Sequence, residues 1–103
     1  MLTLPIKKKW FDMIKSGEKK EEYREIKKYW FTRFKNNMGC LFDDKLIIHL
    51  AQGKVIFQNG YQKKAPKIMC KVNITTEFGK EKWGAEPNKL YYVLKILSVE
   101  EVK

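Results

Sequence analysis

Residues 17–24 read Gly-Glu-Lys-Lys-Glu-Glu-Tyr-Arg and connect a predicted helix to a predicted strand. Four of them, Gly17, Lys19, Glu22 and Arg24, fit the spacing G-x-K-x-x-E-x-R. If the end of this stretch is extended, side chains two apart share a face of the sheet, so Glu22 and Arg24 point the same way. A carboxylate beside a guanidinium forms a planar hydrogen-bonding surface that suits a polar planar ligand such as the edge of a base. The spacing alone favours a simpler interpretation, a solvated ion pair that contributes little to stability.

An amphipathic helix is predicted immediately before this stretch. Ile6, Trp10 and Ile14 recur at the spacing of one helical face. Pro5 suits the first helical turn, and Gly17 suits the left-handed conformation that ends a helix. We therefore expect a helix that starts at Pro5, ends at Gly17, and packs Trp10 and Ile14 on the core.

The rest of the chain predicts one further helix and several strands. Residues 27–35 have helical spacing, and the Asn- and Gly-rich residues 36–39 end that helix. The Gln-Gly pair at 52–53 is predicted to be a turn, and the Asn-Gly pair at 59–60 is a strong signal for a tight hairpin turn. The predicted strands are residues 1–4, 46–51, 55–57, 67–78 and 89–102.

The two long predicted strands differ in how they meet the core. Residues 67–78 alternate between apolar and polar side chains, which indicates one buried face. That face is predicted to carry Ile68, Cys70, Val72, Ile74 and Phe78. Residues 89–102 are apolar on both faces, which is typical of a strand buried on both sides. Helices early and strands late predict the α+β class, with a small sheet curled into a barrel, in one domain spanning residues 1–103.

The charge of the chain is its most unusual compositional feature. Lys and Arg number 22 against 12 acidic residues, so the net charge is +10. Such a surplus on a small domain favours a polyanionic partner, usually nucleic acid or anionic lipid. Only Arg24 and Arg33 are arginines, which weakens the case for specific base reading. The alternative is that the lysines serve only solubility.

The cysteines and the histidine give no metal site. Cys40 and Cys70 lack a Cys-x-x-Cys spacing, and His49 is the only histidine. We expect both cysteines to be reduced packing residues rather than partners of His49 in catalysis, and we expect no metal and no cofactor. The chain has no apolar run of membrane-spanning length and no cleavable signal before Pro5, so we expect a cytoplasmic protein, most simply a monomer.

A basic loop with an aromatic residue follows the predicted hairpin turn. Residues 60–66 contain Tyr61, Lys63 and Lys64. Such a loop can stack a base on its aromatic ring while its lysines contact phosphate. The alternative is that Tyr61 packs on the rim of the barrel.

With these elements in place, the chain resembles the ASCH domain family, whose members are small PUA-like mixed β-barrels with helices across the barrel openings. The resemblance rests on the run from Leu4 through Trp10 into the Gly17–Arg24 motif, and on the later Trp83-Gly84 pair. It extends to the closing strand and covers essentially the whole chain. The small size is most similar to the short members found in phages and Firmicutes.

The resemblance implies a role in binding RNA or a nucleoside or nucleotide, through a cleft between the barrel and the first helix. Carried over to this sequence, Lys19, Glu22 and Arg24 are the expected ligand contacts, and Gly17 permits the turn. Lys19 would contact a phosphate or carbonyl oxygen, and Glu22 would accept a hydrogen bond from an amino group. Arg24 would hold Glu22 in place or bind phosphate itself.

Some short members of the family are amidohydrolases that remove the acetyl group from acetylated cytidine. In them the motif lysine is catalytic, a threonine occupies the position of Glu22, and a distant glutamate completes the site. The catalytic residues here would be Lys19, polarising the amide carbonyl, and Glu22, acting as general base on a water. The distant glutamate could be Glu77, Glu81 or Glu86. A third possibility is a protein-interaction domain without a ligand.

Overall fold

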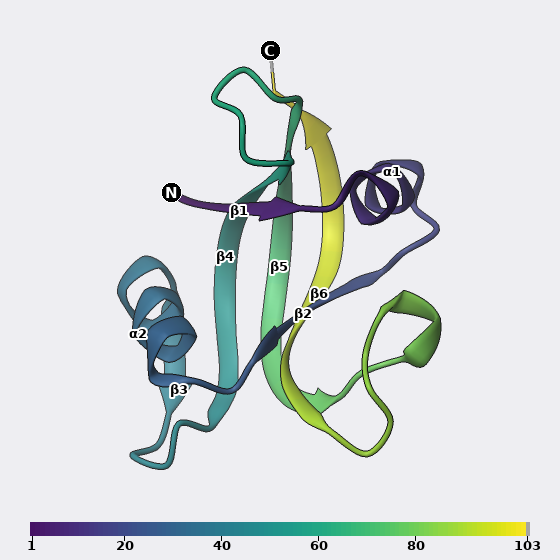
Figure 1. Cartoon of the computed structure of the whole chain (residues 1–103). Helices are drawn as coiled ribbons and strands as arrows, with labels where there is room; N and C mark the ends of the chain where they lie inside the picture. The colour runs from purple at the N-terminus through teal and green to yellow at the C-terminus, as the bar shows by residue number, and fades with distance from the viewer. Residues whose placement is uncertain (103) are drawn as a thin grey trace.

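One mixed sheet, curled into a half-barrel, organises the chain, and both helices pack against it (Figure 1). The computed structural model describes residues 1–102. Its elements are β1 (Leu2–Ile6), α1 (Lys8–Ser16), β2 (Glu21–Glu25), α2 (Lys28–Asn37), β3 (Gly39–Phe42), β4 (Ile48–Asn59), β5 (Lys67–Phe78), the 3₁₀ turn η1 (Glu81–Trp83) and β6 (Leu90–Glu101). These elements confirm the α+β class, the mixed sheet and the two packed helices.

The order of the strands leaves the sheet with two free ends. The strands run β1-β4-β5-β6-β2, and β3 adds to β4. β1 pairs with β4 in parallel, whereas the other neighbours are antiparallel. β1 and β2 are thus the terminal strands, and no backbone ladder joins them in the described residues. We call the interval between β1 and β2 the seam.

The concave side of the sheet holds the hydrophobic core. Large side chains from four strands and both helices are fully or almost fully buried there, which removes most of their apolar area from water. They include Leu4, Ile14, Phe34, Phe57, Ile68, Ile74, Tyr92 and Leu94. β6 is buried on both faces only from Tyr91 to Leu94; outside this stretch the prediction was wrong, since Leu90 and Leu97 are 43% and 60% exposed.

The predicted start of the first helix was wrong. Pro5 lies in β1 rather than at a helix start, and α1 begins at Lys8. Proline is tolerated there because β1 is a terminal strand that needs no N–H donor on its outer side. Trp10 is only partly buried and packs beside the core, while its neighbour Phe11 is 3% exposed. Gly17 ends α1 in the left-handed conformation with φ +86°, as predicted.

The sheet also corrects three strand predictions. Residues 52–53 form no turn, since β4 runs through them and Gly53 pairs with Val72. Glycine is needed there because a Cβ would lie 2.8 Å from the Cγ of Met38. Phe78 is 62% exposed rather than buried, because it ends β5 beyond the core. β3 was missed, since its four residues give too short a pattern to predict a strand.

Candidate functional site

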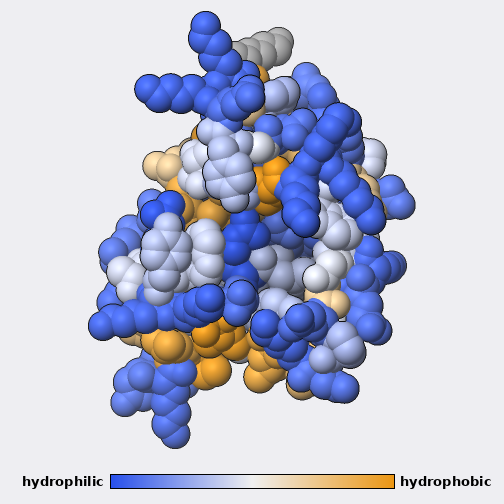
Figure 2. Space-filling view, viewed as in Figure 1, coloured by the Kyte–Doolittle hydropathy of each residue, from blue (hydrophilic) through white to orange (hydrophobic). Residues whose placement is uncertain are grey.

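A cleft of about 910 Å³ lies over the seam. Its floor comes from β1 and β2, one wall from α1 and η1, and the opposite wall from the start of α2. The lining residues are Pro5, Ile6, Lys7, Lys8, Trp10, Glu22, Tyr23, Arg24, Glu25, Tyr29, Trp30, Gly60, Tyr61, Trp83, Gly84 and Tyr91. In Figure 2 this face is hollowed near its centre, where hydrophilic surface lies between paler side chains.

The walls of the cleft are aromatic. All three tryptophans of the chain line it: Trp10 in α1, Trp30 in α2 and Trp83 in η1. Tyr29 and Tyr61 add two phenol rings, and these are 59% and 88% exposed. Flat apolar faces on opposite walls, with exposed rings at the rim, are suited to a planar ligand that inserts between them.

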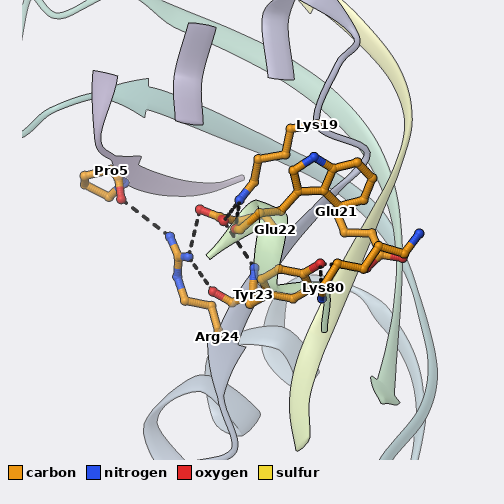
Figure 3. Close-up of polar contacts among 8 residues, drawn as sticks. Pro5, Lys19, Glu21, Glu22, Tyr23, Arg24 and Lys80 are labelled. Carbon is orange, nitrogen blue, oxygen red and sulfur yellow. Dashed lines mark hydrogen bonds and ion pairs between the residues drawn. The ribbon is translucent and has the colours of Figure 1, made fainter. Parts of the chain in front are cut away.

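Glu22 and Arg24 form the floor of the cleft (Figure 3). Arg24 donates from Nη1 to Glu22 Oε2 over 3.1 Å and to the Tyr23 carbonyl over 2.8 Å. Its Nη2 donates to the Pro5 carbonyl of β1 over 3.4 Å. The guanidinium also lies 5.1 Å from the Trp30 ring centroid. The shared strand face predicted from the spacing of these two residues is therefore present.

Lys19 lies behind Glu22 rather than in the cleft. Its side chain is fully buried, and its Nζ donates to Glu22 Oε1 over 2.9 Å and to the Trp83 carbonyl over 2.7 Å. The ammonium also lies 4.2 Å from the Trp10 ring centroid and 5.4 Å from that of Tyr23. Burial lowers the pKa of this ammonium, although the adjacent Glu22 carboxylate opposes the shift. Lys19 thus joins the floor to the η1 wall and does not line the main cleft.

Arg24 also links the two strands at the seam, where the described residues form no backbone ladder. Glu22 Oε1 accepts from the Tyr23 N–H over 3.2 Å. Arg24 donates hydrogen bonds to the carbonyls of Tyr23 and Pro5, which lie on opposite sides of the seam. Because unpaired backbone groups on a buried strand edge are costly, these contacts stabilise a sheet that stops short of closing.

The floor keeps some hydrogen-bonding capacity for a ligand. Glu22 Oε1 accepts two hydrogen bonds, from Lys19 and from the Tyr23 N–H, whereas Oε2 accepts only one, from Arg24. A carboxylate oxygen has two acceptor sites, so Oε2 has one left. Arg24 uses both Nη1 hydrogens and one on Nη2, so Nε–H and the second Nη2 hydrogen remain. An acceptor and donors therefore lie side by side at the base of the cleft.

Gly84 brings the η1 wall close to α1. It has φ +100° and ends the 3₁₀ turn, with its N–H donating to the Glu81 carbonyl. A Cβ at this position would lie 3.0 Å from Cζ2 of Trp10. The glycine therefore meets two demands at once, a left-handed backbone and close contact with an indole.

The other predicted site residues divide between the cleft and the surface outside it. Gly17 lines a separate hollow of about 160 Å³ together with Lys19. Tyr61 lines the main cleft. Lys63 and Lys64 are exposed in the same loop, outside the lining.

Sequence reasoning missed much of the aromatic lining. The second helix was predicted over residues 27–35, but neither Tyr29 nor Trp30 was given a role in a site. Trp83 was named only in the Trp83-Gly84 pair that carries the resemblance. The available signal was the surplus of aromatic residues in the segments that flank the basic motif. This signal could not show that these residues line one cleft, because that depends on the curl of the sheet.

The carboxylates considered for a distant catalytic role lie elsewhere. None of Glu77, Glu81 and Glu86 lines the cleft, whereas Glu25 does. Within residues 1–102, no group of three His, Cys, Asp or Glu side chains could hold a metal ion. Cys70 is buried, which raises the pKa of its thiol to about 12, and Cys40 is half-buried. None of the helices described here combines the length and apolarity needed to cross a bilayer.

No family model, curated protein or solved structure matches this chain.

Proposed function

We propose that this chain is an ASCH-type, PUA-like domain that binds RNA or a nucleotide, with a base held in the cleft over the seam. The observation that carries the proposal is the placement of Glu22 and Arg24 at the floor between aromatic walls. The motif spacing, the helix-to-strand connection and the position of the cleft beside α1 agree with the resemblance to that family.

The chemistry of the cleft fits a nucleobase better than a purely apolar ligand. A base offers two flat faces, which stack on indole and phenol rings such as Trp30 and Tyr61. Its edge carries donors next to acceptors, which complement the spare acceptor on Glu22 and the spare donors on Arg24. An apolar ligand would leave the spare acceptor of Glu22 and the spare donors of Arg24 without partners, which is costly.

The charge of the molecule favours RNA among base-containing ligands. The net charge of +10 attracts a polyanion over a long range and raises the rate of encounter. Lys7 and Lys8 line the cleft itself, so positive charge is present where a strand would enter.

The test is an electrophoretic shift of short single-stranded RNA at several salt concentrations. Affinity should fall steeply with salt, with a logarithmic slope of roughly −0.7 per phosphate contact. Arg24→Gln should weaken binding about tenfold or more, because it removes charged hydrogen bonds. Lys71→Gln removes the same charge from an exposed position on β5 outside the cleft and should have little effect. Absence of a shift even at low salt would overturn the proposal and favour a protein-interaction domain.

A second candidate function is amide hydrolysis on acetylated cytidine or a related modified nucleoside. The spare acceptor on Glu22 Oε2 could take a proton from water, which would attack the acetyl carbon and release acetate and cytidine. The carbonyl oxygen would be polarised by Arg24, because Lys19 is enclosed behind Glu22. Lys19 would contribute only by holding Glu22.

Chromatography of acetylated cytidine incubated with the protein tests this candidate. Glu22→Gln should abolish acetate release, since an amide cannot act as the base. Turnover that persists in Glu22→Gln would exclude this role of the carboxylate. Turnover that survives Lys19→Ala in folded protein would exclude any catalytic need for Lys19.

A further inference from the structure

The charged residues of the cleft are unevenly distributed. Lys7 and Lys8 line its rim at the start of α1, and Glu25 lines it on β2. Between them, the floor carries Glu22 and Arg24. A ligand with a charged end and a neutral end would therefore bind in one preferred direction.

The floor suits a base edge better than a phosphate. Glu22 is paired with Lys19 and Arg24, and the oxygens of its carboxylate only accept hydrogen bonds. A phosphate could accept from the spare donors of Arg24, but it would also face Glu22 Oε2 with like charge. A base edge, which combines donors and acceptors, meets no such repulsion.

The α1 rim has the opposite character. In residues 1–102, Lys7 has no carboxylate within 4.0 Å, whereas Lys8 is paired with Asp12 over 2.5 Å on the exposed side of the helix. On the β2 side, Glu25 is accompanied by Lys27 and Lys89 at 3.7 and 3.6 Å. Among the described residues that line the cleft, the lysine without a paired carboxylate is thus Lys7, at the α1 rim.

The loop after β4 brings a hydroxyl group to the same rim. The Gly60 N–H donates to the Ile6 carbonyl over 3.0 Å, which ties the loop to the residue before Lys7. Tyr61 follows Gly60, lines the cleft and is 88% exposed. Tyr61, which can stack and offers a hydroxyl, and Lys7, which is unpaired in the described part of the chain, therefore come from backbone segments that are joined at one end of the cleft.

From this arrangement we infer that the ligand is a nucleoside phosphate, bound with its base toward Glu22 and Arg24 and its phosphate toward Lys7, Lys8 and Tyr61. The inference rests on the proposed function, since it concerns the same cleft. It names the ligand class as a phosphorylated nucleotide, either free or within an RNA strand, rather than a free nucleoside.

Tryptophan fluorescence gives a direct readout, because every tryptophan of the chain lines the cleft. The four ribonucleosides and their 5′-monophosphates would be titrated into the protein at low salt. The best-bound base should bind about tenfold more tightly as its monophosphate, the size expected for a charge-assisted contact. Inorganic phosphate alone should bind more weakly than that monophosphate.

The matched variants are Lys7→Gln/Lys8→Gln and Lys54→Gln/Lys71→Gln. Each removes two charges, but Lys54 and Lys71 are exposed cross-strand neighbours on β4 and β5 outside the cleft. In the rim variant the monophosphate should bind no more tightly than the nucleoside. In the sheet variant the advantage should remain.

Equal binding of nucleoside and monophosphate would overturn the inference and leave the proposed function intact. An advantage that survives in the rim variant would also overturn it. Absence of any fluorescence response to all eight compounds and to a single-stranded hexaribonucleotide would overturn both. A hexaribonucleotide that binds tenfold more tightly than the monophosphate supports RNA as the source of the nucleotide, and equal binding supports a free nucleotide.

Discussion

Two ion clusters of similar chemistry lie in very different surroundings. In the buried cluster, Lys19, Glu22 and Arg24 are joined by contacts of 2.9 and 3.1 Å, with side chains at most 13% exposed. In the exposed pair, Lys95 and Glu77 are 2.7 Å apart, with side chains 43% and 44% exposed. The shorter distance belongs to the exposed pair, so distance alone does not rank their importance.

The difference lies in what each carboxylate would lose without its partners. Glu77 would simply be solvated by water, so its pair with Lys95 contributes at most about 1 kcal/mol. Glu22 would remain as a buried charge at the seam. Buried ion pairs are weak evidence for net stability, but removing one partner is strongly destabilising. The buried cluster therefore combines two roles, since it holds the seam and also forms the floor of the cleft.

The largest expected effect is that of Lys19→Ala. It leaves the Glu22 carboxylate buried without its ammonium and frees the Trp83 carbonyl. We expect a loss of about 3–5 kcal/mol in the free energy of unfolding, measured by urea denaturation. The sequence motif alone suggested a ligand contact whose loss would cost little stability. A loss below about 1 kcal/mol would contradict the buried cluster.

A double variant separates charge from packing at the same position. Lys19→Met/Glu22→Leu removes both charges of the pair and keeps similar volumes. Since apolar replacements of a whole buried pair are often tolerated, it should be more stable than Lys19→Ala. Ligand binding should nevertheless be lost, because the floor no longer has its carboxylate.

The next effect in size is that of Arg24→Gln. This change removes the hydrogen bond that spans the seam and the stack on Trp30. We expect a loss of about 1.5–3 kcal/mol, the range for hydrogen bonds to charged groups. Hydrogen exchange should rise in β1 and β2 before it rises in β5. Unchanged exchange in β1 would show that Arg24 does not hold the seam.

The smallest effect is that of Glu77→Gln in the exposed pair. Hydrogen bonds from Lys95 and then Thr75 lower the pKa of Glu77 below its ordinary value of 4.5. A lowered carboxyl pKa contributes stability above pH 4.5 that is lost as the pH falls below it. The variant should cost less than about 1 kcal/mol at pH 7, and the difference from wild type should shrink as the pH falls below 4.5. A cost that grows toward acid pH would contradict this sign.

The same contrast explains how far the sequence could predict the molecule. Periodicity and Gly17 predicted the end of α1, and alternation predicted the buried face of β5, because these signals are local. The turn predicted at Gly53 was wrong because this glycine instead leaves room for the side chain of Met38, which is distant in the sequence. The helix start predicted at Pro5 was wrong because proline is tolerated on a terminal strand, and the position of β1 at the end of the sheet depends on the order of all the strands.

The candidate site was predictable only in part. The spacing of Glu22 and Arg24 placed both on one face, as the structure has them. The burial of Lys19 could not be foreseen, because it depends on Trp83, 64 residues further along the chain. The aromatic walls of the cleft could not be predicted from the sequence either, since only the curl of the sheet brings α2 and η1 to the seam.

The most direct test of the account is a ¹⁵N–¹H correlation spectrum recorded while a single-stranded hexaribonucleotide is added. The indole N–H signals of Trp10, Trp30 and Trp83 report on both walls of one cleft. We predict that all three shift together, while the backbone amides of Lys54 and Lys71 on the exposed face of the sheet stay in place. Unmoved indole signals, or the largest shifts at Lys54 and Lys71, would contradict a base-binding cleft over the seam.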